Sequence, residues 1–150
     1  MGNTYTQIYI HYIFSTKHRK PVISHKFESR LWSYLGGIAR ANNMIPIAIG
    51  GVQDHVHALI AIPSTVSMSK SIQLLKGGSS KWLNDNFFRD RTFRWQKGYG
   101  AFSVSESMIP KVVNYIKNQK EHHQSKTFKE EYLGLLKKYN VSFDEAYVFD

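Results

Sequence analysis

Two histidines spaced two residues apart, His55 and His57, are the side chains of this chain best suited to chemistry. They lead into an apolar run, Ala58 to Ile62, that is typical of a strand. Because side chains alternate along a strand, both imidazoles are expected on the same face of a sheet. Neutral imidazole is the commonest metal ligand in proteins, so the pair predicts two ligands of a metal site. The same spacing is also compatible with two histidines that only pack or form hydrogen bonds.

A second group of polar side chains lies further along the chain. Tyr115 and Gln119 are spaced i, i+4 in a predicted helix and therefore share one face, opposite its apolar side. His122 and His123 extend that face and are rival candidates for a third metal ligand. An exposed helix surface often carries the same residue types. This group therefore indicates a functional site only in combination with His55 and His57.

The two groups together predict phosphoryl chemistry. Two imidazoles and the amide carbonyl of Gln119 could hold a divalent ion with positions free for phosphate oxygens. A tyrosine hydroxyl has a pKa of about 10, so a nearby cation would help Tyr115 to ionise and attack a phosphodiester. The product of that attack is a covalent phosphotyrosine. Asp54, at a turn just before the histidines, is expected either to orient a ligand or to serve the turn itself.

The charge of the chain favours a nucleic acid as partner. Its formal net charge is +9 and its sequence pI is about 9.7. Aromatic residues lie among the basic ones, which suits single-stranded nucleic acid because bases stack on rings while cations contact phosphates. A run of charges can also be ordinary solvated surface. The candidate DNA-contacting residues in the densest basic and aromatic stretch are Lys76, Lys81, Arg89, Arg91, Arg94 and Lys97.

The predicted elements follow the order β-α-β-β-α-β-α-α. This order predicts an α+β fold with a ferredoxin-like, RRM-like antiparallel sheet, helices on one face and the other face open. Two glycines at 77–78 weaken the prediction of the helix that contains them. The expected strands are 4–16, 45–52, 55–62 and 101–104, and the expected helices are 24–41, 67–86, one that starts at 106 or 107, and 128–139.

Length and composition set the outer limits. The 150 residues suit a single domain, 1–150, with one core. The chain has no cysteine, which excludes disulfides and thiolate chemistry. It has no apolar run long enough to span a membrane and no signal-like start, so we expect a cytoplasmic protein without a membrane partner.

Four blocks of the sequence resemble a known family, the single-tyrosine HUH transposases. These are the TnpA-type enzymes of small insertion sequences and their repeat-associated relatives. The histidine pair and the Tyr-x-x-x-Gln pattern carry the resemblance, which extends over nearly the whole chain. The matching blocks are Gly51–His57, Lys76–Trp82, Trp95–Val104 and Tyr115–His123.

The resemblance implies a transposase that cleaves and rejoins single-stranded DNA. Tyr115 would form a 5′-phosphotyrosine link, and His55, His57 and Gln119 would hold Mg²⁺ or Mn²⁺. Members of the family bind DNA hairpins at the ends of their element and form homodimers in which two subunits share each active site. Two alternatives stay open: a non-catalytic nucleic-acid-binding module on the same fold, and a metal-dependent nuclease that uses water as nucleophile.

Overall fold

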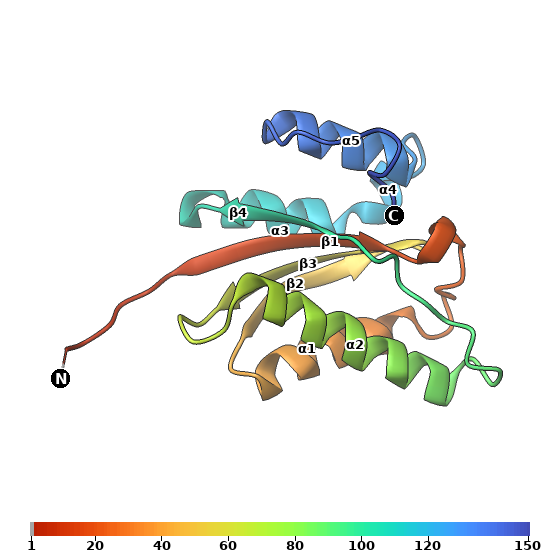
Figure 1. Ribbon diagram of the computed structural model, residues 1–150, viewed down its shortest axis with the longest axis horizontal. Helices are drawn as coiled ribbons and strands as arrows, with labels where there is room; N and C mark the ends of the chain where they lie inside the picture. Colours follow the sequence, from red (N-terminus) through yellow and green to blue (C-terminus); the bar gives the residue numbers. More distant parts are fainter. Residues whose placement is uncertain (1) are drawn as a thin grey trace.

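A four-stranded antiparallel sheet forms the centre of the computed structural model, which describes residues 2–150 (Figure 1). The strand order is β2-β3-β1-β4, the order of a ferredoxin-like sheet, so the predicted α+β class is confirmed. The strands are β1 (Ile8–Ser15), β2 (Ile45–Gly51), β3 (His55–Ile62) and β4 (Gly100–Val104). The helices are α1 (Glu28–Ala41), α2 (Met68–Asn86), α3 (Ile109–Lys117), α4 (Gln119–His122) and α5 (Phe128–Lys138), with 3-10 turns at Lys17–Arg19 and Glu106–Met108.

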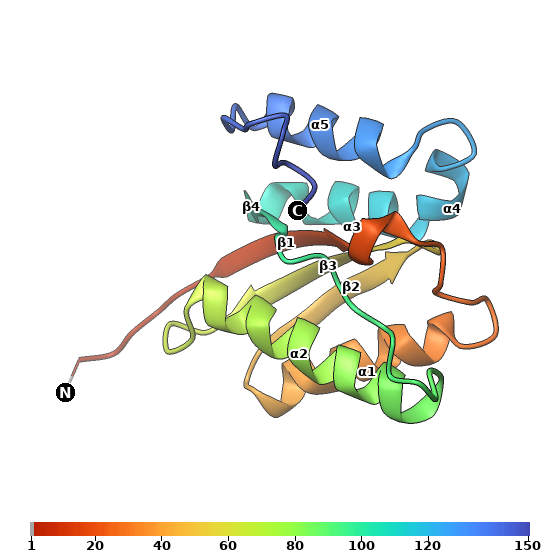
Figure 2. The same ribbon diagram turned by 45° about the vertical axis from the view of Figure 1, so that its right-hand side comes forward.

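Helices α1 and α2 cover one face of the sheet (Figures 1 and 2). Alternation along the central strands directs Tyr12 and Phe14 of β1, and Val56 and Ile60 of β3, into this layer, where all four are fully buried. Full burial of a large apolar side chain stabilises a protein by about 1.5–3 kcal/mol, so this layer is the main core.

Helices α3 to α5 lie on the opposite face, which the sequence predicted to be open (Figure 2). The expectation fails here because α3 and α5 carry apolar stripes that need a partner surface. Helix α5 packs Phe128, Tyr132 and Leu136 against Ile13 of β1 and Phe102 of β4. Helix α3 packs mainly through its buried residue 116 against β2 and β3. The second face is therefore a second, smaller core.

The helices differ from the sequence prediction at several points. Helix α1 begins at Glu28 and α3 at Ile109, later than the expected starts at 24 and at 106 or 107. Helix α2 ends at 86 as expected and runs without a break through the glycines at 77–78, where Gly78 allows the close approach of Ile38 from α1. The helix that carries Tyr115 ends at Lys117, because Asn118 adopts φ −101° and ψ 24° before α4 begins. A capping box of Thr127 and Glu130 fixes the start of α5.

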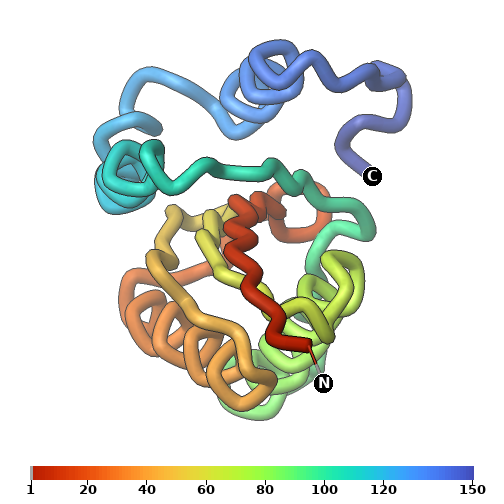
Figure 3. The backbone as a smooth tube through the Cα atoms, turned by 90° about the vertical axis from the view of Figure 1, so that its left-hand side faces the viewer, coloured from red at the N-terminus to blue at the C-terminus, as the bar shows by residue number. Residues whose placement is uncertain are grey.

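The segment after α5 turns back towards the sheet (Figure 3). The carbonyl oxygen of Asp150 accepts a hydrogen bond of 2.8 Å from the backbone N–H of Gly98, just before β4. Phe149 packs near the rings of Phe128 and Tyr132. These contacts tie the end of the chain to the layer that contains α5.

Across residues 2–150, none of the helices combines the length and the apolar character that crossing a membrane requires.

Candidate functional site

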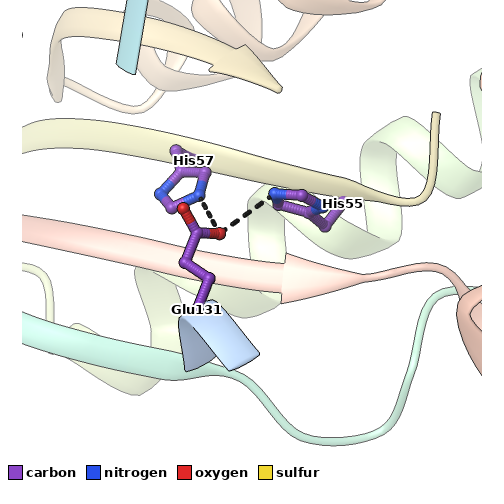
Figure 4. A group of neighbouring side chains, drawn as sticks. All are labelled: His55, His57 and Glu131. Carbon is purple, nitrogen blue, oxygen red and sulfur yellow. Dashed lines mark hydrogen bonds and ion pairs between the residues drawn. The ribbon is translucent and has the colours of Figure 1, made fainter. Parts of the chain in front are cut away.

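His55 and His57 stand side by side on β3 and point towards the layer of α3 to α5, as strand alternation predicts (Figure 4). Both side chains are fully buried. Their Nε2 atoms face one oxygen of Glu131, at 3.2 Å from His55 and 3.0 Å from His57. The two histidines therefore converge on a carboxylate that comes from α5.

Glu131 is the centre of the cluster. Its Oε1 atom also lies 3.1 Å from Nε2 of His123. Its Oε2 atom accepts hydrogen bonds from Nε2 of Gln119, at 3.1 Å, and from the hydroxyl of Tyr115. The side chains of the two predicted groups thus meet around one glutamate, which is only 5% exposed.

The outer nitrogens of the two histidines also have partners. Nδ1 of His55 lies 2.8 Å from the carboxylate of Asp54, and because a carboxylate only accepts, this nitrogen carries a hydrogen. Nδ1 of His57 lies 2.8 Å from Nε2 of His11 on β1, a buried residue. Such partners fix the orientation of metal-ligating imidazoles. Asp54 is thus placed where the sequence suggested it could orient a ligand.

The histidines differ in their affinity for protons. Burial opposes protonation of His55, but the hydrogen bonds with Asp54 and Glu131 outweigh it and raise the pKa of His55 to about 9. Burial lowers the pKa of His57 to about 4 and that of His11 to about 3. Burial alone would raise the pKa of Glu131, yet hydrogen bonds with three imidazoles hold this pKa well below its usual range. The cluster therefore contains an anionic Glu131 beside a cationic His55.

Tyr115 is half-buried beside this cluster. Its ring stacks on His122, with centroids 4.6 Å apart, and meets the ring of His57 edge-on at 5.6 Å. Burial and the hydrogen bond to Glu131 raise the pKa of Tyr115 above its usual range. The phenol is therefore protonated in this arrangement, and any attack by its oxygen would require loss of that proton.

The donor set fits a divalent metal ion. Nε2 of His55 faces two acceptors, Oε1 of Gln119 at 2.9 Å and Oε1 of Glu131 at 3.2 Å. Acceptors that converge in this way need a hydrogen-bond donor or a cation between them. The Nε2–H group of His55 supplies the donor here, and a metal ion bound at that nitrogen would supply the cation. One ligand atom each from His55, His57 and Glu131 lies within 4.8 Å of the others. Imidazole nitrogen and carboxylate or carbonyl oxygen are ligands that Mn²⁺ accepts.

The predicted DNA-contacting residues lie elsewhere. Helix α2 is on the opposite side of the sheet from the cluster, and the segment that follows it leads to β4 (Figure 1). Lys76 donates hydrogen bonds to the carbonyl oxygens of residues 96, 97 and 98, so it anchors the chain before β4. Lys81 and Arg91 both pair with Asp85 at 2.8 Å. Arg94 bonds to nearby carbonyls, while Arg89 and Lys97 are exposed. Contact of these six residues with DNA stays a prediction.

Two cavities flank the cluster. One, of about 620 Å³, opens between β4, α3 and α5 and is lined by His11, Tyr115 and Tyr139, with Lys111 and Lys138 among its other lining residues. The other, of about 600 Å³, is lined by Asp54 and His123 and also by Lys120 and Lys126. Both cavities have lysine side chains in their lining and lie beside the cluster, which suits an anionic ligand such as a nucleic acid strand.

Sequence reasoning missed Glu131 and His11. The signal for Glu131 was its helical spacing, three residues after Phe128 and four before Leu135, which places a carboxylate on the apolar face of α5. The signal for His11 was strand alternation, which puts it on the same face as Ile13. Neither signal names a partner, because the contacts join elements far apart in the sequence.

Comparison with known proteins shows the family of this chain. The family model described as "Transposase IS200 like" matches residues 4–119. The chain belongs to the IS200-like transposase family. Transposases of insertion sequence element IS200 from Salmonella typhimurium and Salmonella typhi are each 30% identical over 117 residues, covering 74% of this chain and 76% of the relative.

Solved structures support the assignment to the IS200-like transposases. A putative transposase from Deinococcus radiodurans matches with a TM-score of 0.64 and 26% identity, covering 79% of this chain and 96% of that one. A REP-associated tyrosine transposase bound to a REP hairpin shares the fold, with a TM-score of 0.61 and 13% identity over 82% of this chain and 73% of that one. The chain is therefore a DNA transposase, and the cluster around Glu131 is its candidate active site.

Proposed function

We propose that this transposase cleaves and rejoins single-stranded DNA through a 5′-phosphotyrosine on Tyr115, in a reaction that depends on Mg²⁺ or Mn²⁺. The observation that carries the proposal is the meeting of the Tyr115 hydroxyl with His55, His57 and Gln119 in one buried cluster. His55, His57 and the carbonyl of Gln119 would hold the ion. A bound divalent ion would supply Lewis-acid stabilisation of the charge that develops on the phosphate.

The remaining chemistry belongs to the side chains. The hydroxyl oxygen of Tyr115 would attack the scissile phosphorus, and the bond from phosphorus to the 3′ oxygen would break and leave a 3′-OH. Oε2 of Glu131 accepts the hydrogen of that hydroxyl and so orients the attacking oxygen, and the proton that Tyr115 loses would end on the departing 3′ oxygen. Attack of a DNA 3′-OH on the phosphotyrosine would then rejoin a strand and free Tyr115.

The proposed substrate is a DNA hairpin at the end of an insertion sequence. The protein would act on it in the cytoplasm, where it would associate with chromosomal DNA. The net charge of +9 and the two cavities with cationic linings support an anionic strand beside the cluster. The structural relative bound to a REP hairpin supports a hairpin as the form of that DNA. A homodimer with shared active sites completes the proposal.

Tyr115→Phe is the direct test of the nucleophile. The substitution removes only the hydroxyl, so we expect unchanged binding to single-stranded hairpin DNA and complete loss of the covalent protein–DNA adduct. Denaturing gel electrophoresis with end-labelled DNA measures the adduct, and a filter-binding assay measures affinity. Cleavage by the Phe variant at the wild-type rate would establish water as the nucleophile and favour the nuclease alternative.

Removal of the metal is the second test. We expect excess EDTA and the variant His57→Ala each to abolish cleavage, and Mn²⁺ to restore activity to the EDTA-treated wild-type protein only. Circular dichroism checks that the variant keeps its fold. Undiminished cleavage in EDTA would show that no divalent ion takes part. DNA binding without cleavage under every condition would favour the non-catalytic module.

A further inference from the structure

We propose that Glu131 of α5 is the anionic ligand of the metal site, which adds a carboxylate to His55, His57 and the carbonyl of Gln119. The inference rests on the proposed metal-dependent function. It assigns a role in the active site to a part of the chain that lies beyond residues 4–119, the region that matches the family model.

The ion pairs of Glu131 give the first argument. A carboxylate is very seldom buried unless it is paired with a cation or coordinates a metal. Among the residues that the structure describes, the ion pairs of Glu131 are with the imidazoles of His55, His57 and His123, and none involves lysine or arginine. The positive partner in the structure is the imidazole of His55, both of whose nitrogens face acceptors. A divalent ion bound at Nε2 of His55 would take the place of that hydrogen and become the positive partner of the carboxylate.

The second argument is that the two oxygens of Glu131 contact different groups. Oε1 faces the Nε2 atoms of three histidines at 3.0–3.2 Å, so nitrogen donors already surround it. Oε2 faces Tyr115 and Gln119. One oxygen can therefore bind an ion beside His55 and His57 while the other stays in contact with the nucleophile. Hard carboxylate oxygen is also the ligand type that Mg²⁺ and Mn²⁺ favour.

The third argument is that α5 holds Glu131 rigidly. The capping box at Thr127 fixes the first turn of the helix, in which Glu131 lies. Phe128 and Tyr132, which flank it on the apolar side, are buried against β1 and β4. A carboxylate held from both sides reaches the cluster with little loss of side-chain freedom, which favours tight binding.

Isothermal titration calorimetry with MnCl₂, in the absence of DNA, tests the proposal. The full-length wild-type protein should bind one Mn²⁺ per chain, and His57→Ala should lose this binding, which locates it. Glu131→Gln keeps the shape of the side chain and removes its charge, so we expect Mn²⁺ affinity to fall at least about tenfold. Glu145→Gln makes the same charge change at an exposed position outside the cluster and should bind like the wild type.

A second variant guards against misfolding. Glu131→Asp keeps the charge but shortens the side chain, and we expect an affinity between those of the wild type and Glu131→Gln, with a wild-type circular dichroism spectrum. If Glu131→Gln binds Mn²⁺ as tightly as the wild type, Glu131 is not a ligand, while the metal-dependent reaction proposed above still stands. If the wild type binds no Mn²⁺ at a site that depends on His57, both this proposal and the metal dependence of the reaction fail.

Discussion

At the scale of single residues, the hydrogen bond between His11 and His57 would make His11 a positioning residue of the proposed metal site. The two rings lie with centroids 5.0 Å apart, and both are buried. Partners of this kind hold a metal-ligating imidazole in the right orientation, and their loss typically lowers metal affinity 10–100-fold. His11 is suited to this position because neutral imidazole can either donate or accept.

We therefore expect His11→Leu to weaken Mn²⁺ binding by about 10–100-fold without a change in the cleavage site on DNA. His11→Gln keeps a donor and an acceptor and should weaken binding less. Calorimetric titration of the two variants beside the wild type measures both effects. Three equal affinities would show that His57 does not need this partner.

Local periodicity accounts for the site residues that the sequence could predict. The strand period of two places His55 and His57 on one face. The spacing of four predicted that Tyr115 and Gln119 lie together, and both contact Glu131, although Asn118 ends α3 and places Gln119 in the next helix, α4. Glu131 could not be predicted in the same way. Its partners come from β3, α3 and α4, and only the docking of α5 on the sheet decides that its carboxylate meets them.

At the scale of elements, the docking of α3 on β2 decides where the tyrosine lies. Gly50 of β2 faces the backbone of α3, and a Cβ atom at this position would lie 3.2 Å from the carbonyl oxygen of Ile116. The obstacle is backbone, so it cannot move without the helix. Gly50 therefore allows Ile116 to approach β2 closely, and this contact brings the helix that carries Tyr115 onto the sheet.

We expect Gly50→Val to destabilise the protein by about 1–3 kcal/mol, as overpacking does, and to push α3 away from the sheet. Formation of the phosphotyrosine adduct should fall further than the loss of folded protein explains. Urea denaturation and the adduct assay measure the two effects. Gly77→Ala is the control, because no atom lies within 4 Å of its added Cβ and alanine in a helix is more stable than glycine by about 0.5–1 kcal/mol.

The sequence predicted most of the helices and strands but not which face of the sheet each helix covers. Alternating and helical patterns located β1 to β4, α1 and α2, and the expected helix over 128–139 begins where α5 does. The pattern cannot say which surface an amphipathic helix covers, so the face occupied by α3 to α5 was expected to be open. Helix propensity also overstated the effect of the glycines at 77–78 on the helix. The packing of α2 against α1 outweighs their weak tendency to form helix.

At the scale of the whole molecule, the structure bears on how two subunits would share an active site. One chain brings Tyr115 to its own His57, so sharing requires exchange of α3 to α5 between subunits. Residues 105–108 connect β4 to α3 and are all exposed, so this connection can open without uncovering core. Exchange of identical elements keeps every contact and is a low-cost route to a dimer.

A mixture of two inactive variants tests the shared site. Tyr115→Phe protein and His57→Ala protein are combined under conditions that allow subunit exchange. If α3 to α5 are exchanged, one site of the mixed dimer pairs intact histidines with an intact tyrosine, and we expect adduct formation to return in part. Mass spectrometry of the intact assembly confirms that mixed dimers form. Mixed dimers without activity would show that each chain builds its own site.

The contact between His11 and His57 also makes the site readable by nuclear magnetic resonance. Nε2 of His57 faces the carboxylate of Glu131 and so carries the hydrogen, which leaves Nδ1 to accept from His11. A ligating Nε2 cannot keep that hydrogen, so metal binding would transfer it to Nδ1 and reverse the direction of the contact with His11. The ¹⁵N shifts of a ring distinguish a protonated nitrogen from a bare one. In ¹⁵N-histidine-labelled protein, diamagnetic Mg²⁺ should therefore move the Nδ1 signal of His57 to the range of a protonated nitrogen and the Nε2 signal out of that range, a spectral signature of loading that needs neither DNA nor turnover.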